Sequence, residues 1–98
     1  MAASSSSPGI AVVIYGTGSC AFCMLARRLL KGKGVSFEEI RVDKDPVQRE
    51  VMERRSGRET VPQVFAGDRH LGGYTDLVAL DREGELDALL GLEEGRGL

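Results

Sequence analysis

The sequence has few of the residues from which metal centres and membrane spans are built. Its 98 residues include two cysteines, one histidine and no tryptophan. A zinc site needs about four ligands, and the two cysteines together with His70 fall short of that number within one chain. No apolar run approaches the roughly 18–20 residues that span a bilayer. We therefore expect neither a zinc-binding protein nor a membrane protein.

Charge of one sign is not in excess either. Lys and Arg number 13 against 15 Asp and Glu, which gives a net charge of −2. A nucleic-acid binder usually carries a basic excess, and a polybasic segment is what an anionic membrane surface attracts. We expect no partner of either kind. A chain of this length has room for one domain only.

The two ends of the chain hold little that could be buried. Residues 1–9 read MAASSSSPG, without an aliphatic residue beyond two alanines. They have no basic segment before an apolar run, as a secretory signal would, and residues 91–98 alternate glycine with charge. We expect a flexible tail at 1–9, a domain at 10–90 and a frayed tail at 91–98. The absent signal and the scarcity of cysteine favour the cytoplasm.

Hydrophobic periodicity predicts a strand–helix–strand unit in the first half of the domain. The continuous β-branched run at 10–15 suits a strand buried on both faces, and residues 35–42 suit a second strand. Two strands joined by a helix form a βαβ unit, so these strands should be parallel. The helix between them is predicted by apolar residues at positions i, i+3, i+4, i+7 and i+8, namely Phe22, Leu25, Ala26, Leu29 and Leu30.

In the second half the pattern predicts a helix, a hairpin and two further helices. Asp45 and Pro46 are typical of a helix cap and first position, and Thr75 is the expected cap of a later helix. Residues 61–66 and 69–71 are predicted strands around a two-residue turn. The fold class is therefore α/β with the order β-α-β-α-β-β-α-α. The 46–56 helix should have a thin apolar face, formed by Val47, Val51 and Met52. His70 is expected to be exposed in the hairpin. The last helix should be short, with Leu86, Leu89 and Leu90 as its apolar residues.

Cys20 and Cys23 lie three positions apart between the first strand and the first helix. Partial positive charge at a helix N-terminus stabilises a thiolate, and the thiolate is the form that attacks disulfides. Cys23 would follow one turn later, close enough to resolve a mixed disulfide. We expect Cys20 to be the exposed nucleophile and Cys23 the more buried partner. A C-x-x-C pair near a βαβ pattern is typical of thioredoxin-like redox proteins.

Two plainer interpretations of this pair remain open. A structural disulfide between Cys20 and Cys23 would close a very short loop and constrain little chain entropy. The two side chains could also simply pack in the interior. The strand–turn–helix context favours redox chemistry over both.

Five short motifs follow one another along the domain. They are Tyr15 with Ser19-Cys20-x-Phe22-Cys23, then residues 34–37 (GVSF), 55–58 (RSGR), 60–62 (TVP) and 71–77 (LGGYTDL). In this order and spacing they make residues 10–90 resemble a bacterial dithiol glutaredoxin. The resemblance implies a thioredoxin-like fold, with a four-stranded mixed sheet flanked by helices. It also implies glutathione-dependent reduction of disulfides, with glutathionylated or disulfide-bonded proteins as partners.

The resemblance implies a glutathione site around Cys20. Pro62 would be a cis-proline that turns the Val61 backbone toward the substrate, although a trans proline opening an edge strand is the alternative. Backbone N–H groups at the start of a helix would bind the γ-glutamyl carboxylate, and Asp76 the ammonium, unless Asp76 only complements the helix dipole. The implied set is Thr17, Phe22, Thr60, Val61, Pro62, Gly73, Tyr74, Thr75 and Asp76. Phe22 fits the helix core equally well.

Two positions depart from the family pattern. Ala21 follows the first cysteine where proline is frequent, and Thr17 stands where a lysine would pair with the glycyl carboxylate of glutathione. Arginines near the end of the second helix could replace that lysine, although such a group is also typical of a solvated face. The candidates are Arg49, Arg54, Arg55 and Arg58.

The missing proline leaves an alternative function open. Glutaredoxins that lack it sometimes bind a two-iron two-sulfur cluster between two protomers, and Cys20 of each chain with two glutathione thiolates would supply the ligands. The principal interpretation is a monomeric glutathione–disulfide oxidoreductase, with a cluster-carrying dimer as the alternative. A redoxin reduced by a flavin reductase is a third hypothesis, less consistent with the glutathione features at Thr75 and Asp76.

Overall fold

A four-stranded mixed sheet forms the centre of the computed structural model, which describes residues 10–92. The strands are β1 (Val12–Gly16), β2 (Glu38–Arg41), β3 (Gln63–Ala66) and β4 (Arg69–Gly72), in the spatial order β2-β1-β3-β4. β1 pairs with β2 in parallel and with β3 antiparallel, and β3 pairs antiparallel with β4. The expected tail at 1–9, and residues 93–98 of the expected tail at 91–98, lie outside the described residues.

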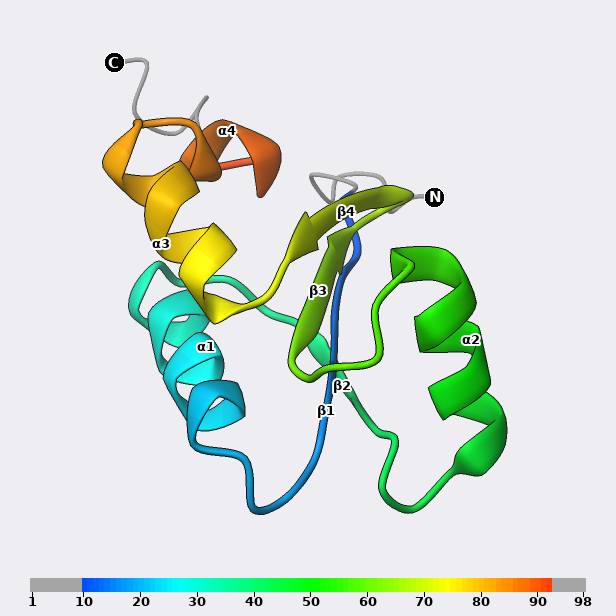
Figure 1. Ribbon diagram of the computed structural model, residues 1–98. Helices are drawn as coiled ribbons and strands as arrows, with labels where there is room; N and C mark the ends of the chain where they lie inside the picture. The colour runs from blue at the N-terminus through cyan, green and yellow to red at the C-terminus, as the bar shows by residue number, and fades with distance from the viewer. Residues whose placement is uncertain (1–9, 93–98) are drawn as a thin grey trace, which may run out of the picture.

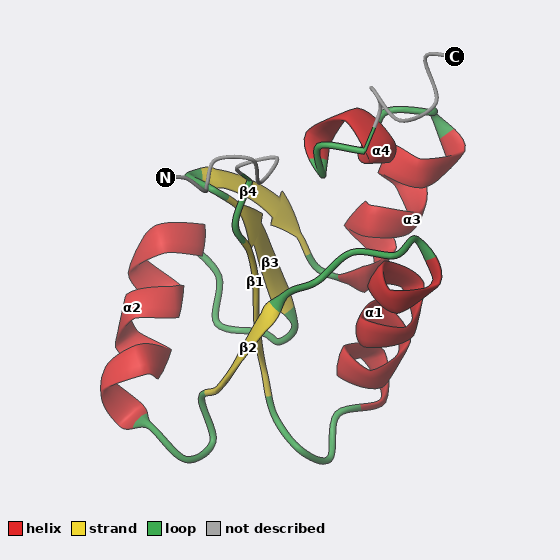
Figure 2. Cartoon of the chain, turned by 180° about the vertical axis from the view of Figure 1, so that it is seen from behind, coloured by secondary structure: helices red, strands yellow, loops and turns green. Residues whose placement is uncertain are grey.

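Helices cover both faces of this sheet (Figures 1 and 2). One face carries α1, α3 and α4, and the opposite face carries α2. Their bounds are Ala21–Gly32 for α1, Pro46–Ser56 for α2, Tyr74–Arg82 for α3 and Leu86–Leu89 for α4. The predicted fold class, element order and parallel first pair of strands are confirmed. None of the described helices is long and apolar enough to cross a membrane.

β1 occupies an inner position in the sheet and is almost entirely buried, as its continuous apolar sequence requires. Tyr15 at its carboxyl end pairs with Gln63 at the beginning of β3. Because these two strands are antiparallel, the chain that leaves β1 and the chain that enters β3 meet at the same edge of the sheet. The C-x-x-C segment and the segment around Pro62 are thereby brought together.

Two separate apolar cores hold the helices to the sheet. The larger one packs Ile14, Leu30, Leu77 and other aliphatic side chains between the sheet and α1, α3 and α4. The smaller one consists of Tyr15, Val42, Met52 and Phe65, on the α2 side.

On α2, Met52 is fully buried, whereas Val47 is 65% exposed, so its predicted place on the core face was wrong. Five residues correspond to about 140° around a helix, and the two side chains therefore cannot share one face.

The helix boundaries confirm one predicted cap and correct another. Asp45 caps α2 by accepting the Gln48 N–H at 3.2 Å. The predicted cap at Thr75 was wrong, because α3 already begins at Tyr74 with Gly73 as its cap. At the other end of the chain, Leu92 packs against the larger core, beyond the expected domain boundary at 90.

Candidate active site

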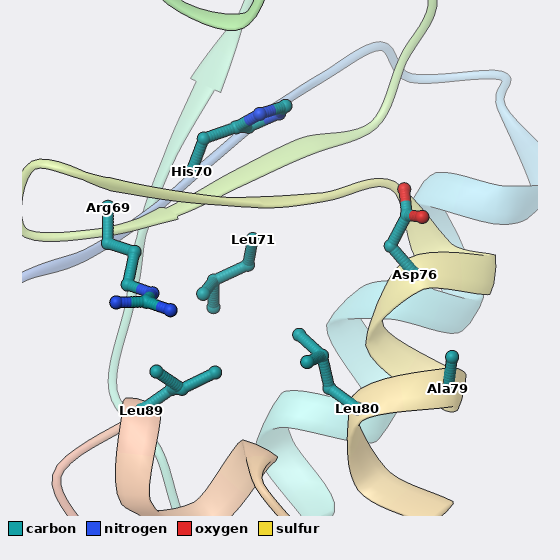
Figure 3. Close-up of a pocket in the computed structure, with 7 residues that line it drawn as sticks. All are labelled: Arg69, His70, Leu71, Asp76, Ala79, Leu80 and Leu89. Atoms are coloured by element: carbon teal, nitrogen blue, oxygen red, sulfur yellow. The ribbon is translucent and has the colours of Figure 1, made fainter. Parts of the chain in front are cut away.

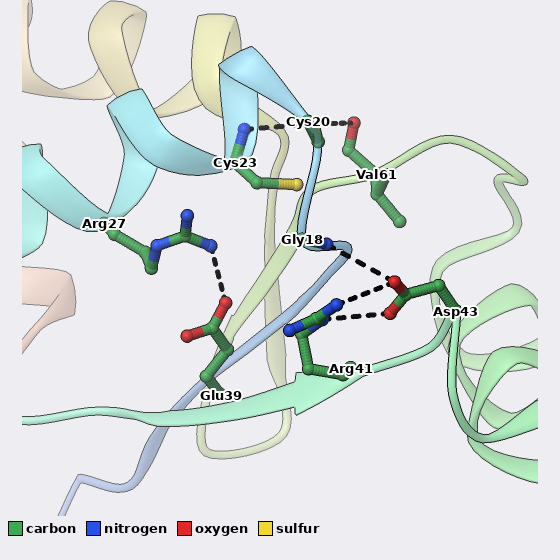
Figure 4. Close-up of polar contacts among 8 residues, drawn as sticks. All are labelled: Gly18, Cys20, Cys23, Arg27, Glu39, Arg41, Asp43 and Val61. Carbon is green, nitrogen blue, oxygen red and sulfur yellow. Dashed lines mark hydrogen bonds and ion pairs between the residues drawn. The ribbon is translucent and has the colours of Figure 1, made fainter.

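Cys20 lies at the point where the loop after β1 turns into α1. It is the N-cap of that helix, and its Sγ accepts the Cys23 N–H at 3.1 Å (Figure 4). A hydrogen bond donated to sulfur at a helix N-terminus stabilises negative charge there. The Cys20 side chain is half-buried, and both cysteines are free thiols. This geometry is suited to an accessible thiolate nucleophile.

Cys23 occupies the opposite environment, one turn into α1. Its side chain is fully buried, and this burial, with the adjacent Cys20, raises the pKa of the Cys23 thiol to about 12. The backbone of Thr17 hydrogen-bonds the same thiol and opposes part of that rise. Gly16 makes room for it, since a Cβ at Gly16 would lie 3.0 Å from the Cys23 Sγ. Cys23 therefore holds its proton at neutral pH, and it is the more buried cysteine, as predicted.

The segment before β3 forms the other side of the thiol site. The Val61–Pro62 peptide bond is cis, as expected from the resemblance. The Val61 carbonyl accepts a hydrogen bond from the Cys20 thiol, with 3.7 Å between sulfur and oxygen (Figure 4). The two segments that meet at the sheet edge are thus in direct contact through the Cys20 side chain.

A groove of about 310 Å³ includes Val61 in its lining and lies next to this contact. Phe22 and Tyr74 form part of its wall, with ring centroids 6.0 Å apart and the ring planes 21° from parallel. The Phe22 side chain is 54% exposed, which excludes the alternative that it packs in the protein interior as part of the apolar face of α1. The lining residues are Phe22, Arg58, Thr60, Val61, Pro62, Gln63, Gly73, Tyr74, Thr75 and Asp76. Every predicted glutathione-binding residue lines this groove except Thr17, which lies beside Cys23.

Opposite charges meet at the end of the groove formed by α3. An Asp76 oxygen accepts the Gly73 N–H at 2.9 Å and is 2.8 Å from an Arg58 guanidinium nitrogen. Arg58 and this N–H hold the pKa of the Asp76 carboxyl below its ordinary value. Gly72 permits the arrangement because it has a φ of +107°, and a Cβ there would overlap the Asp76 carboxylate.

Of the four candidate arginines, Arg58 alone lines the groove. Arg49 binds the Glu53 carboxylate and the Glu59 carbonyl. Arg55 donates to the Tyr15 hydroxyl and lies 4.0 Å above the Phe65 ring centre, so it supports the smaller core. Arg54 lies on the exposed side of α2 beside Glu50 and Glu53.

An ion pair that sequence reasoning missed braces the loop leading to Cys20. Two Arg41 nitrogens contact the two carboxylate oxygens of Asp43 at 2.9 and 2.8 Å, and the Gly18 N–H points to that carboxylate at 3.5 Å (Figure 4). The Arg41 guanidinium lowers the pKa of Asp43 to about 2. The signal available was the parallel pairing of the two strands, since Gly16 and Arg41 are partners in that register.

A second, smaller hollow of about 240 Å³ lies between β4 and the helices α3 and α4. Figure 3 shows Arg69, Leu71, Leu80 and Leu89 around it, with the Asp76 carboxylate directed away from Leu80.

His70 also borders this hollow, and its expected exposure was wrong. The side chain is half-buried, because His70 pairs with Phe65 across the hairpin and the two rings lie in contact, with centroids 4.9 Å apart and planes tilted by 32°.

Comparison with known proteins places this architecture in one family. The Glutaredoxin family model matches residues 12–71. The chain is 51% identical over 79 residues to a glutaredoxin of Pseudomonas aeruginosa, covering 81% of this chain and 94% of that protein. Glutaredoxin 3 of Escherichia coli K12 is also 51% identical over 79 residues, covering 81% of this chain and 95% of the relative.

Solved structures agree with this assignment. The solution structure of a Brucella melitensis glutaredoxin superimposes with a TM-score of 0.75 at 46% identity, covering 85% of this chain and 90% of that one. A buckwheat glutaredoxin–glutathione complex gives a TM-score of 0.76 at 25% identity, covering 83% and 76%. This chain therefore belongs to the glutaredoxin family of thiol–disulfide oxidoreductases.

Proposed function

We propose that this protein reduces protein–glutathione mixed disulfides and protein disulfides with glutathione as the electron donor. The observation that carries the proposal is the groove, which is lined by Val61, whose carbonyl contacts the Cys20 thiol, and by the paired charges of Arg58 and Asp76. Glutathione has a thiol near its middle, and its γ-glutamyl end bears both an ammonium and a carboxylate. The buckwheat relative has been solved as a complex with glutathione.

The charged end of the groove offers a complementary group for each part of the γ-glutamyl end. The first N–H groups of α3 have no acceptor within the helix and point toward an anion. Because the Gly73 N–H already donates to Asp76, those of Tyr74 and Thr75 are the better donors to a carboxylate. When glutathione binds, the Arg58 guanidinium leaves its ion pair with Asp76 and pairs with a carboxylate of glutathione. The Asp76 carboxylate then accepts a hydrogen bond from the ammonium of glutathione.

The Val61 backbone supports the middle of the bound peptide. Val61 lies between the thiol and the charged end of the groove, with its carbonyl at the Cys20 sulfur. The cysteinyl unit of glutathione can pair with this backbone as an added strand. That pairing aligns the glutathionyl sulfur with the Cys20 thiolate.

Reduction of a glutathionylated protein needs Cys20 alone. Its thiolate attacks the glutathionyl sulfur, a Cys20–glutathione disulfide forms, and the protein thiolate leaves and takes a proton from water. A second glutathione thiolate then attacks the glutathionyl sulfur. Oxidised glutathione departs, and the Cys20 thiolate is restored.

Reduction of a protein disulfide uses both cysteines. Cys20 attacks one sulfur of the substrate and displaces the other as a thiolate, which leaves a mixed disulfide between substrate and Cys20. Cys23 gives up its proton to water, attacks the Cys20 sulfur and releases the second substrate thiolate, and the two released thiolates take protons from water. Two electrons have then moved from the dithiol to the substrate, and two glutathione molecules reduce the Cys20–Cys23 disulfide by the same exchange.

The iron–sulfur alternative stays a prediction. Within residues 10–92, no three His, Cys, Asp or Glu side chains gather where they could hold a metal ion. A cluster would therefore take Cys20 as its ligand from this chain and require a second copy and glutathione for the rest. Visible absorption and a dimeric mass after anaerobic reconstitution would support it, and a colourless monomer would exclude it. For the oxidoreductase we propose a monomer that works in the cytoplasm.

A coupled assay tests the proposal. It contains hydroxyethyl disulfide, glutathione, glutathione reductase and NADPH, and it compares the wild type with Cys20→Ser. We expect NADPH oxidation that requires both the protein and glutathione and disappears in the variant. A folded, reduced wild-type protein without turnover would contradict the proposed function.

A further inference from the structure

Gln63 is the single buried polar side chain among the described residues, at 1% exposure. It follows Pro62 directly and begins β3. Its amide nitrogen donates to the Thr60 carbonyl at 3.1 Å and is 3.3 Å from the Thr60 hydroxyl. The buried Gln63 amide is therefore hydrogen-bonded to Thr60, in the segment just before the cis-proline.

The other end of the Gln63 amide meets His70. The distance between Gln63 Oε1 and His70 Nε2 is 2.7 Å. Because the amide nitrogen faces Thr60, the atom facing His70 is the oxygen, which only accepts. His70 Nε2 must therefore carry the proton. The tilted contact with the Phe65 ring restricts the orientation of the imidazole, so the donor is held in position by the hairpin.

We propose that His70 and Gln63 are positioning residues for glutathione, acting through the hydrogen-bonded chain His70–Gln63–Thr60. Thr60 and Val61 line the groove, and neither belongs to a helix or a strand. The chain of hydrogen bonds ties this irregular segment to β3 and β4 and so sets the backbone against which the cysteinyl unit lies. The inference rests on the proposed function, because it assigns these residues to glutathione affinity.

Breaking the chain at either residue should weaken glutathione binding without changing the nucleophile. In His70→Leu and Gln63→Met we expect the KM for a glutathionylated peptide to rise about fivefold, roughly the effect of one net hydrogen bond, while kcat changes little. The rate at which iodoacetamide alkylates Cys20 should change less than the KM, because the Cys23 N–H of α1 still donates to that sulfur even if its contact with the Val61 carbonyl loosens.

A matched pair of substitutions separates positioning from simple destabilisation. In His70→Gln the side-chain amide nitrogen can reach the place of Nε2, so we expect the KM to return to within about twofold of wild type. In His70→Asn the amide nitrogen replaces Nδ1 instead, and the KM should stay high. Arg69→Gln, on the same strand and outside the groove, is the control and should leave the KM unchanged.

Three results would overturn the inference. One is an unchanged KM in folded His70→Leu, with folding judged by its melting temperature. Another is equal KM values in His70→Gln and His70→Asn. The third is a fall in the alkylation rate parallel to the rise in KM, which would place the effect on the thiol.

Nitrogen-15 NMR of the single histidine tests the hydrogen-bonded chain independently of glutathione. We expect the Nε2–H tautomer in wild type, with slow exchange of the Nε2 proton, and faster exchange of that proton in Gln63→Met. An Nδ1–H tautomer in wild type would refute the chain even if the enzyme turns over. An Nε2–H tautomer in a protein that binds no glutathione would instead refute the proposed function and leave the hydrogen bond intact.

Discussion

The two ends of the groove are built by different means. At the thiol end, backbone groups hold Cys20, which caps α1 and contacts the Val61 carbonyl, while the neighbouring Cys23 is fully buried. At the charged end, Arg58 and Asp76 are exposed side chains, with 47% and 41% of their surfaces accessible. The difference teaches that backbone contacts of the fold fix the position of Cys20, whereas the Arg58–Asp76 pair is exposed, and in the proposed function these two charges exchange partners when glutathione binds.

Substitution of the two cysteines should give the largest effects and divide the thiol end into two roles. Cys20→Ser should abolish turnover of every disulfide substrate, because no other accessible thiol exists among the described residues. Cys23→Ser should keep turnover of a glutathionylated peptide and lose reduction of a protein disulfide. Steady-state assays with both substrates measure this. If Cys23→Ser were as inactive as Cys20→Ser on the glutathionylated peptide, the assignment of roles would be wrong.

Alkylation should separate the two thiols directly. Burial raises the pKa of Cys23 to about 12, so its thiolate is scarce at pH 7–8. We expect iodoacetamide to add a single group to the native reduced protein, at Cys20, and two groups after denaturation. Intact-mass and peptide mass spectrometry locate them. Equal rates at both cysteines in the native protein would contradict the contrast between an accessible and a buried thiol.

At the charged end, loss of one carboxylate should affect glutathione alone. Asp76→Ala should raise the KM for glutathionylated substrate about fivefold, since it removes an exposed charge partner. The alkylation rate of Cys20 should not change. Glu50→Ala, on the exposed side of α2, provides the control for loss of one negative charge. A normal KM in Asp76→Ala would remove this residue from the site.

The smallest effect concerns pH. Arg58 and the Gly73 N–H depress the pKa of Asp76, so its charge is complete at neutral pH and is lost only as the pH falls through this lowered value. In Arg58→Gln the pKa of Asp76 should rise, and glutathione affinity should begin to fall at a higher pH than in wild type. Carboxyl carbon-13 NMR titration reports the pKa, and an unchanged Asp76 titration in Arg58→Gln would contradict the ion pair.

The contrast between backbone-held and side-chain-built parts of the groove also explains what the sequence could predict. The β-branched run of β1, the helical stripe after it and the position of Cys20 at their junction follow local rules, and the structure confirms the element order and the relative burial of the two thiols. The cis Val61–Pro62 bond came from family resemblance and is present. These features depend on backbone geometry within short segments.

Features that depend on pairing between distant segments were missed or misplaced. His70 was expected to be exposed, yet Phe65 and Gln63 of the neighbouring strand cover it. The choice of Arg58 among four arginines depends on how the end of α2 faces α3. The cap of α3 is Gly73 and not the predicted Thr75, because the Asp76 carboxylate accepts the Gly73 N–H. Hydrophobic periodicity along the sequence does not report which residues of distant segments come into contact, so it could not predict these three features.

The most direct test of the groove as the glutathione site is an NMR comparison of Cys23→Ser before and after reaction with oxidised glutathione. The reaction should add one glutathionyl group to Cys20. We predict that the largest amide shifts away from Cys20 itself fall on Val61, Tyr74, Thr75 and Asp76, which line the groove. A completed disulfide whose shifts fall instead around Arg69 and Leu89, in the second hollow, would contradict the account.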